Sequence, residues 1–169
     1  MSALRILFWV LLQAFIVSEM VVFSGHAAPQ LHLFSLLLIP IQSSRFVWLF
    51  GCAAAGLALD IALGTYGLHM VSGTFLALCM PIIHRAFAPR EGYEVSDMGT
   101  VYSLGFRWVL STSFFAAWAY CTAVEVISAS QFHLIGGSAL RGLVGGLTTA
   151  VMVAVLQYLI VRRPKHKRN

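Results

Sequence analysis

Long apolar runs separated by short polar breaks are the feature that most constrains how this chain can fold. The runs cover residues 4–24, 29–42, 46–63, 68–87, 101–127 and 141–161. A helix needs roughly 20 mostly apolar residues to cross the hydrocarbon core of a bilayer. Of the 169 residues, 59% are hydrophobic and 10% are charged, and a soluble domain this small could not bury so much apolar surface. The sequence therefore predicts one all-α, polytopic membrane domain of about six transmembrane helices.

The first two runs leave alternatives open. Residues 4–24 are too long for an ordinary signal-peptide core and contain Glu19, so a retained first span is favoured over a cleaved signal peptide. The apolar part of the second run, 31–41, is short and includes Pro40. We expect residues 29–42 to make a short or tilted crossing, and a re-entrant segment is the main alternative.

The positions of the basic residues predict the orientation. If the chain starts in the cytoplasm and crosses six times, ten of the 11 Lys and Arg residues lie on the cytoplasmic side and only Arg141 lies outside. Cytoplasmic segments of membrane proteins carry such an excess of positive charge. We therefore expect both termini in the cytoplasm, with the basic tail 162–169 beside anionic lipid and not bound to nucleic acid.

Ionisable residues inside the apolar runs are the first candidates for a functional site. Glu19, Asp60 and Glu125 lie within runs, and Arg141 begins the sixth. An ionisable side chain within a span costs about 2.5–3.5 kcal/mol, so it usually faces the bundle interior and finds a partner. With six spans, all four residues fall toward the outer ends of their helices. They either form a polar cluster that binds a partner segment or a small solute, or they reach the headgroups or form ion pairs for structural reasons alone.

The most distinctive stretch runs from Gly56 to His69. Four residues in this region recur at a spacing of four and so share one helix face, which would let another helix approach closely: Cys52, Gly56, Asp60 and Gly64. Gly64 and Gly67 flank Thr65-Tyr66 and predict a tight reversal of the chain. For His69, a capping or packing role is favoured over titration or metal binding.

Further residues predict helix packing and no chemistry. Gly142 and Gly146 form a second small-residue face in the last run. Cys52, Cys79 and Cys121 are far apart and lack the spacing of metal ligands or of a disulfide framework. The sequence holds no nucleophile elbow, phosphate loop or HExxH motif. It therefore predicts no enzymatic activity, no cofactor and no metal site.

Several features follow one another in a recognisable order along nearly the whole chain. A short proline-containing second run precedes Gly56 and Asp60, and Gly67-Leu68-His69 opens the fourth run. The later features are a loop from Pro89 to Glu94, Glu125 at the end of the fifth run, Phe132 in the next loop, and Ser138 to Arg141 before the last run and the basic tail. This order resembles the MreD family of rod-shape-determining membrane proteins, in the form found in Bacteroidetes.

The resemblance implies a function, a location and partners. MreD-like proteins are non-enzymatic inner-membrane subunits of the bacterial elongation complex, which directs lateral-wall peptidoglycan synthesis. They bind MreC, a single-span protein with a periplasmic domain, and act beside MreB, RodA and penicillin-binding synthases. By this resemblance, the candidates for partner binding or a structural role are Gly56, Asp60, Gly67, His69, Glu19, Glu125 and Arg141.

Two other functions remain as alternatives. The MreD fold is similar to the substrate-binding subunits of energy-coupling-factor vitamin transporters, so a solute-binding subunit is the main one. It predicts a bound small molecule and an associated cytoplasmic ATPase module. An intramembrane enzyme that uses Asp60, Glu19 or His69 is the weaker one, because no catalytic motif surrounds these residues.

Overall fold

A computed structural model describes residues 2–17, 29–94, 97–129 and 135–161. These residues form helices joined by turns, with one isolated antiparallel bridge between Pro40 and Met98. The elements, in chain order, are α1 (Ser2–Leu12), the π-helical turn η1 (Gln13–Val17), α2 (His32–Leu37), α3 (Arg45–Leu63), α4 (Leu68–Ala86), α5 (Val101–Leu104), α6 (Phe106–Ala129) and α7 (Ile135–Ile160).

Three of the described helices are long and apolar enough to cross a membrane. They are α3, α6 and residues 137–160 of α7, with 19, 24 and 24 residues respectively. Large apolar side chains on their outward faces remain exposed, as at Phe50, Ile61 and Leu159. Water would penalise such faces, whereas lipid would not. These helices indicate a membrane protein.

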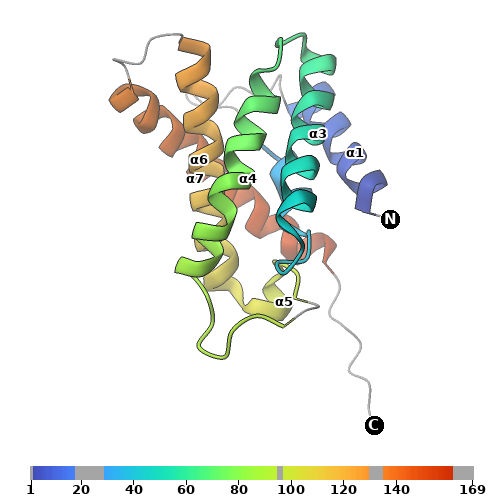
Figure 1. The fold of residues 1–169 in the computed structure, drawn as a ribbon, viewed down its shortest axis with the longest axis vertical. Coiled ribbons are helices and arrows are strands. Elements are labelled where there is room, and N and C mark those ends of the chain that lie inside the picture. The colour runs from blue at the N-terminus through green and yellow to red at the C-terminus, as the bar shows by residue number, and fades with distance from the viewer. Residues whose placement is uncertain (1, 18–28, 95–96, 130–134, 162–169) are drawn as a thin grey trace.

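The helices form a bundle in which sequence neighbours lie side by side (Figure 1). Helices α3 and α4 are antiparallel, α4 packs against α6, and α6 packs against α7 along much of its length. Helix α1 covers α3 and α2. The start of α3 and the end of α4 lie at the same end of the bundle as α5 and the end of α7. The reversal between α3 and α4 lies at the opposite end.

Glycines set how closely the helices approach each other. A Cβ atom on Gly73 of α4 would lie 2.6 Å from the carbonyl oxygen of Cys52 in α3. A Cβ on Gly142 of α7 would lie 2.8 Å from the backbone nitrogen of Thr122 in α6. Real Cβ atoms do not come this near to backbone, so only glycine permits these crossings. The predicted glycine face of the last run therefore lies at the α6–α7 contact.

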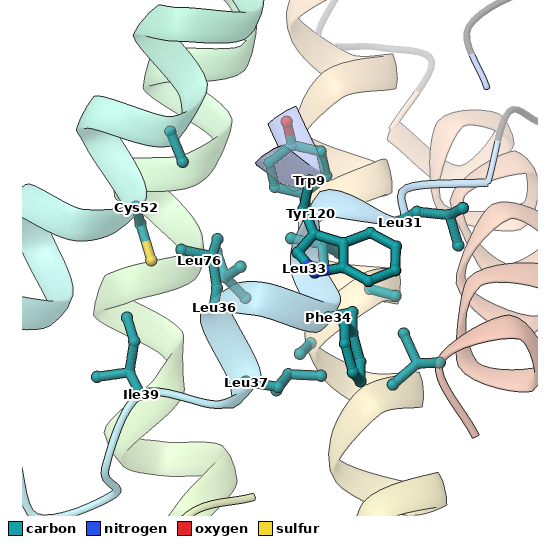
Figure 2. Close-up of a cluster of buried hydrophobic side chains, with 14 of the residues drawn as sticks. Trp9, Leu31, Leu33, Phe34, Leu36, Leu37, Ile39, Cys52, Leu76 and Tyr120 are labelled. Carbon is teal, nitrogen blue, oxygen red and sulfur yellow. The ribbon is translucent and has the colours of Figure 1, made fainter. Parts of the chain in front are cut away.

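The second run differs from its expected form. Residues 29–42 do not make a helix of membrane length: α2 has six residues, which span about 9 Å. All six are buried at the centre of the bundle, where Trp9 meets Phe34 at a ring-centroid distance of 4.9 Å (Figure 2). Pro40 lies in the turn that follows and takes part in the bridge to Met98.

Side chains from other helices form hydrogen bonds with the backbone of this segment where it is not helical. The Gln13 amide donates to the carbonyl of Pro29 at 3.0 Å and accepts from the N–H of Leu31 at 2.6 Å. The N–H of Gln30 donates to the hydroxyl of Thr149, near the middle of α7, at 2.9 Å. Irregular backbone is tolerated at membrane depth only where protein satisfies it in this way.

The other described helices can be compared with the remaining apolar runs. Helices α3 and α4 match the third and fourth runs within a residue or so at each end. The fifth run is divided at Gly105, whose φ of 86° ends α5. Helix α7, which covers nearly all of the sixth run, begins at Ile135 rather than near 141. The first run is helical through Val17, and its remainder, with Glu19, lies outside the described residues. Phe132 and the tail 162–169 also lie outside them.

Candidate functional site

The stretch from Gly56 to His69 forms the corner that joins α3 to α4. Gly64 ends α3 with a φ of 69°, and Gly67 precedes α4 with a φ of 92°. Tyr66 between them also has a positive φ, 50°, and its side chain is fully exposed. The structure thus confirms the tight reversal expected from the two glycines.

Asp60 caps the helix that follows its own. Its carboxylate is buried and accepts the backbone N–H of His69 at 2.9 Å and that of Met70 at 2.8 Å. The hydroxyl of Thr65 donates to the same carboxylate. The first N–H groups of a helix have no partner within it, and Gly67 at the cap position has no side chain to offer. Asp60 replaces the missing cap and places negative charge at the positive end of the α4 dipole.

Gly56 makes this capping geometry possible. It lies one turn before Asp60 and faces the start of α4, where an added Cβ would overlap the carbonyl oxygen of His69. The Cα of Met70 would lie 2.6 Å from this added Cβ. The two helices therefore meet at backbone contact distance, which brings the N–H groups of α4 within reach of the Asp60 carboxylate.

His69 extends the corner into the core through Tyr120. The Nδ1 atom of His69 and the hydroxyl of Tyr120 on α6 are 2.9 Å apart. His32 of α2 lies edge-on to the Tyr120 ring, with centroids 5.1 Å apart. Tyr120, labelled in Figure 2, is completely buried on α6 and contacts His69 of α4 and His32 of α2. Tyr120 and His32 were not predicted as site residues; the available signal in the sequence was a polar ring within an apolar run.

Glu125 and Arg141 form a separate contact. An Arg141 guanidinium nitrogen lies 3.6 Å from a carboxylate oxygen of Glu125, which joins α6 to α7. Both side chains are partly exposed, at 54% and 29%, and exposed pairs of this kind contribute at most about 1 kcal/mol. Neither residue shares a hydrogen bond with Asp60 or His69 in the described part of the chain. Among the described residues, Asp60 therefore lies in a buried cap, and Glu125 and Arg141 form a separate, partly exposed ion pair of the kind that the structural alternative predicted. Glu19 lies outside the described residues.

An aromatic cluster closes the opposite end of the bundle. The Trp108 indole donates to the Tyr93 hydroxyl at 3.1 Å, and that hydroxyl donates to the carbonyl of His84 at 2.6 Å. The His84 ring stacks on Trp108 and lies edge-on to Trp48. Partial burial raises the pKa of Tyr93 above its ordinary value, so its hydroxyl keeps the proton that it donates. No motif in the sequence pointed to this cluster.

The chemistry available at the corner is limited, because its polar atoms already bind one another. Among the residues that the structure describes, no group of three His, Cys, Asp or Glu side chains could hold a metal ion. The described cysteines are free thiols, with Cys52 and Cys121 buried and Cys79 partly so. Asp60 is committed to backbone donors and His69 to Tyr120. Compared with known proteins, the chain matches no protein-family model, no curated protein and no solved structure.

Proposed function

We propose that this chain is a non-enzymatic inner-membrane subunit of the bacterial cell-elongation complex, and that it binds a MreC-like single-span protein. The observation that carries the proposal is the corner from Gly56 to His69, the most specific part of the resemblance to MreD. Its residues act together as one structural unit, with Gly56 at the helix contact and Asp60 at the cap. A stretch that shapes the bundle in this way suits a protein whose role is to hold partners.

The proposal includes six crossings with both termini in the cytoplasm. Arg45 starts α3, Arg85 is in the last turn of α4, and Arg107 is in the first turn of α6. These three helix ends share one end of the bundle (Figure 1), which supports the predicted accumulation of positive charge on the cytoplasmic side. The second crossing would be the broken segment 29–42, held by the surrounding helices.

The state of the acidic residues favours an adaptor over an enzyme. A general acid or base must reach a substrate proton. The Asp60 carboxylate is buried and accepts three donors from the corner itself. Glu125 is paired with Arg141. Of the two acids predicted as catalytic candidates, Asp60 therefore has structural partners, and Glu19 lies outside the described residues.

The test is to identify what co-purifies with a tagged copy from its native host in mild detergent. We expect a MreC-like protein, with MreB, RodA and penicillin-binding synthases, and we expect depletion to make a rod-shaped host round. Recovery of an ATPase module or a bound vitamin without a MreC-like protein would instead support the transporter subunit. An unchanged cell shape after depletion would also contradict the proposal.

A further inference from the structure

A cavity of about 400 Å³ opens at the basic end of the bundle, far from the Asp60 corner. It lies between the start of α3, the end of α4 and the segment 41–43. Arg45 and Arg85 line it from these two helices, and both are exposed at its rim. Arg45 precedes Asp60 by 15 residues on α3, which places the two sites roughly 22 Å apart.

Neither arginine has a partner among the residues that the structure describes. In the described residues, no hydrogen bond or ion pair involves either guanidinium, whereas Arg141 is paired with Glu125. A guanidinium group offers a planar set of donors that matches the oxygens of a phosphate group. Two such groups on one rim favour an anionic ligand with several acceptor oxygens.

His84 contributes a buried polar group to the wall of the same cavity. Its side chain is 7% exposed, and its ring is held between Trp48 and Trp108, with centroids 5.4 Å and 6.0 Å away. No hydrogen bond reaches its ring nitrogens from any described residue. Buried polar side chains normally have a hydrogen-bond partner, and a neutral imidazole offers one donor and one acceptor. A ligand in the cavity would supply a hydrogen-bond partner that the described residues do not.

The cavity changes character along α4. Arg85 and Tyr93 lie at its polar end, whereas Ala77, Met80 and Pro81 form an apolar wall. Ala77 precedes Arg85 by eight residues, or about 12 Å along the helix. An inorganic phosphate ion would use only the polar end. A phospholipid would use both, with its headgroup at the arginines and an acyl chain along the apolar wall.

We propose that this cavity binds an anionic phospholipid, with its phosphate at Arg45, Arg85 and His84 and an acyl chain against the apolar wall formed by Ala77, Met80 and Pro81. The aromatic side chains Trp48 and Tyr93 beside the polar end are of the type that prefers the headgroup region. The cavity is separate from the Gly56–His69 corner on which the proposed function rests, because no residue of that corner lines it.

The test is native mass spectrometry of the purified full-length chain with phosphatidylglycerol or phosphatidylcholine of identical acyl chains. We expect phosphatidylglycerol to be retained in preference to phosphatidylcholine. The double variant Arg45→Gln/Arg85→Gln should retain roughly ten-fold less phosphatidylglycerol, because charge-assisted hydrogen bonds to the phosphate are lost. Both arginines are exposed, so the variant should fold.

Arg107→Gln is the matched control. It removes one positive charge, half of what the double variant removes, at the same end of the bundle, and Arg107 does not line the cavity. Retention of phosphatidylglycerol should be unchanged in this variant, and excess inorganic phosphate should fail to displace the lipid. Equal loss in the control, equal retention of the two lipids, or displacement by phosphate alone would each overturn the proposal. Displacement would identify a free anion as the ligand.

Discussion

The carboxylate of Asp60, on α3, accepts the backbone N–H of His69, in the first turn of α4, at 2.9 Å. One helix thereby caps the next across a turn of only four residues, Gly64 to Gly67. The Asp60 carboxylate is buried, and a buried donor or acceptor that loses its partner costs more than an exposed one. The cap therefore does more for stability here than an exposed cap would do.

Removing the Asp60 carboxylate should destabilise the protein. Asp60→Ala leaves the N–H groups of His69 and Met70 without an acceptor, which should lower the free energy of unfolding by about 2 kcal/mol or more. Asp60→Asn keeps one carbonyl acceptor and should lose less. Thermal unfolding of both variants in the same detergent measures the difference, and an unchanged melting temperature for Asp60→Ala would contradict the capping role.

Gly56 and Gly51 provide a matched pair on α3. A Cβ on Gly56 would overlap the carbonyl of His69, whereas a Cβ on Gly51 would lie 3.5 Å from a methyl group of Ile39, an ordinary contact. Gly56→Ala should therefore force α3 and α4 apart and cost about 1–3 kcal/mol. Gly51→Ala should be neutral or slightly stabilising, because alanine favours a helix over glycine. Equal effects in a thermal unfolding experiment would show that the close contact at Gly56 does not matter.

The α6–α7 contact can be tested in the same manner with Gly146 and Gly137. A Cβ on Gly146 would lie 2.9 Å from the Cα of Trp118, and one on Gly137 would meet no atom within 4 Å. Gly146→Ala should lower stability by about 1–3 kcal/mol, and Gly137→Ala should not. Spin labels on α6 and α7 should report a greater separation only in the Gly146 variant. A separation that stays the same would argue against backbone contact at this crossing.

Tyr120→Phe tests the hydrogen bond between α4 and α6. The substitution preserves the ring but removes the hydroxyl that lies 2.9 Å from Nδ1 of His69. Leaving a buried imidazole nitrogen without its partner should cost about 1–3 kcal/mol. A double-mutant cycle with His69→Ala isolates the interaction, since the hydroxyl should contribute little once the imidazole is absent. Full additivity of the two substitutions would contradict the coupling.

Features local in sequence could be predicted, and features that join distant segments could not. The apolar run 46–63 and the glycines at 64 and 67 define α3 and the reversal that follows it, and all lie within about twenty residues. The Asp60 cap was missed because its acceptor and donors belong to different helices. Tyr120 and His69 are 51 residues apart, and His84 meets Trp48 and Trp108 only in the folded bundle. A single polar residue in an apolar run does not indicate its partner.

The irregular backbone at residues 29–31 imposes an order on the making of this protein. Membrane helices carry their own backbone hydrogen bonds into lipid and are stable there one at a time. The backbone N–H of Gln30 instead donates to the hydroxyl of Thr149, which is synthesised 119 residues later. The second segment therefore cannot reach its final state until the last helix has left the ribosome. The final fold of this segment therefore requires α7 to dock against it, and a chain that ends before Thr149 would leave the Gln30 N–H without this acceptor.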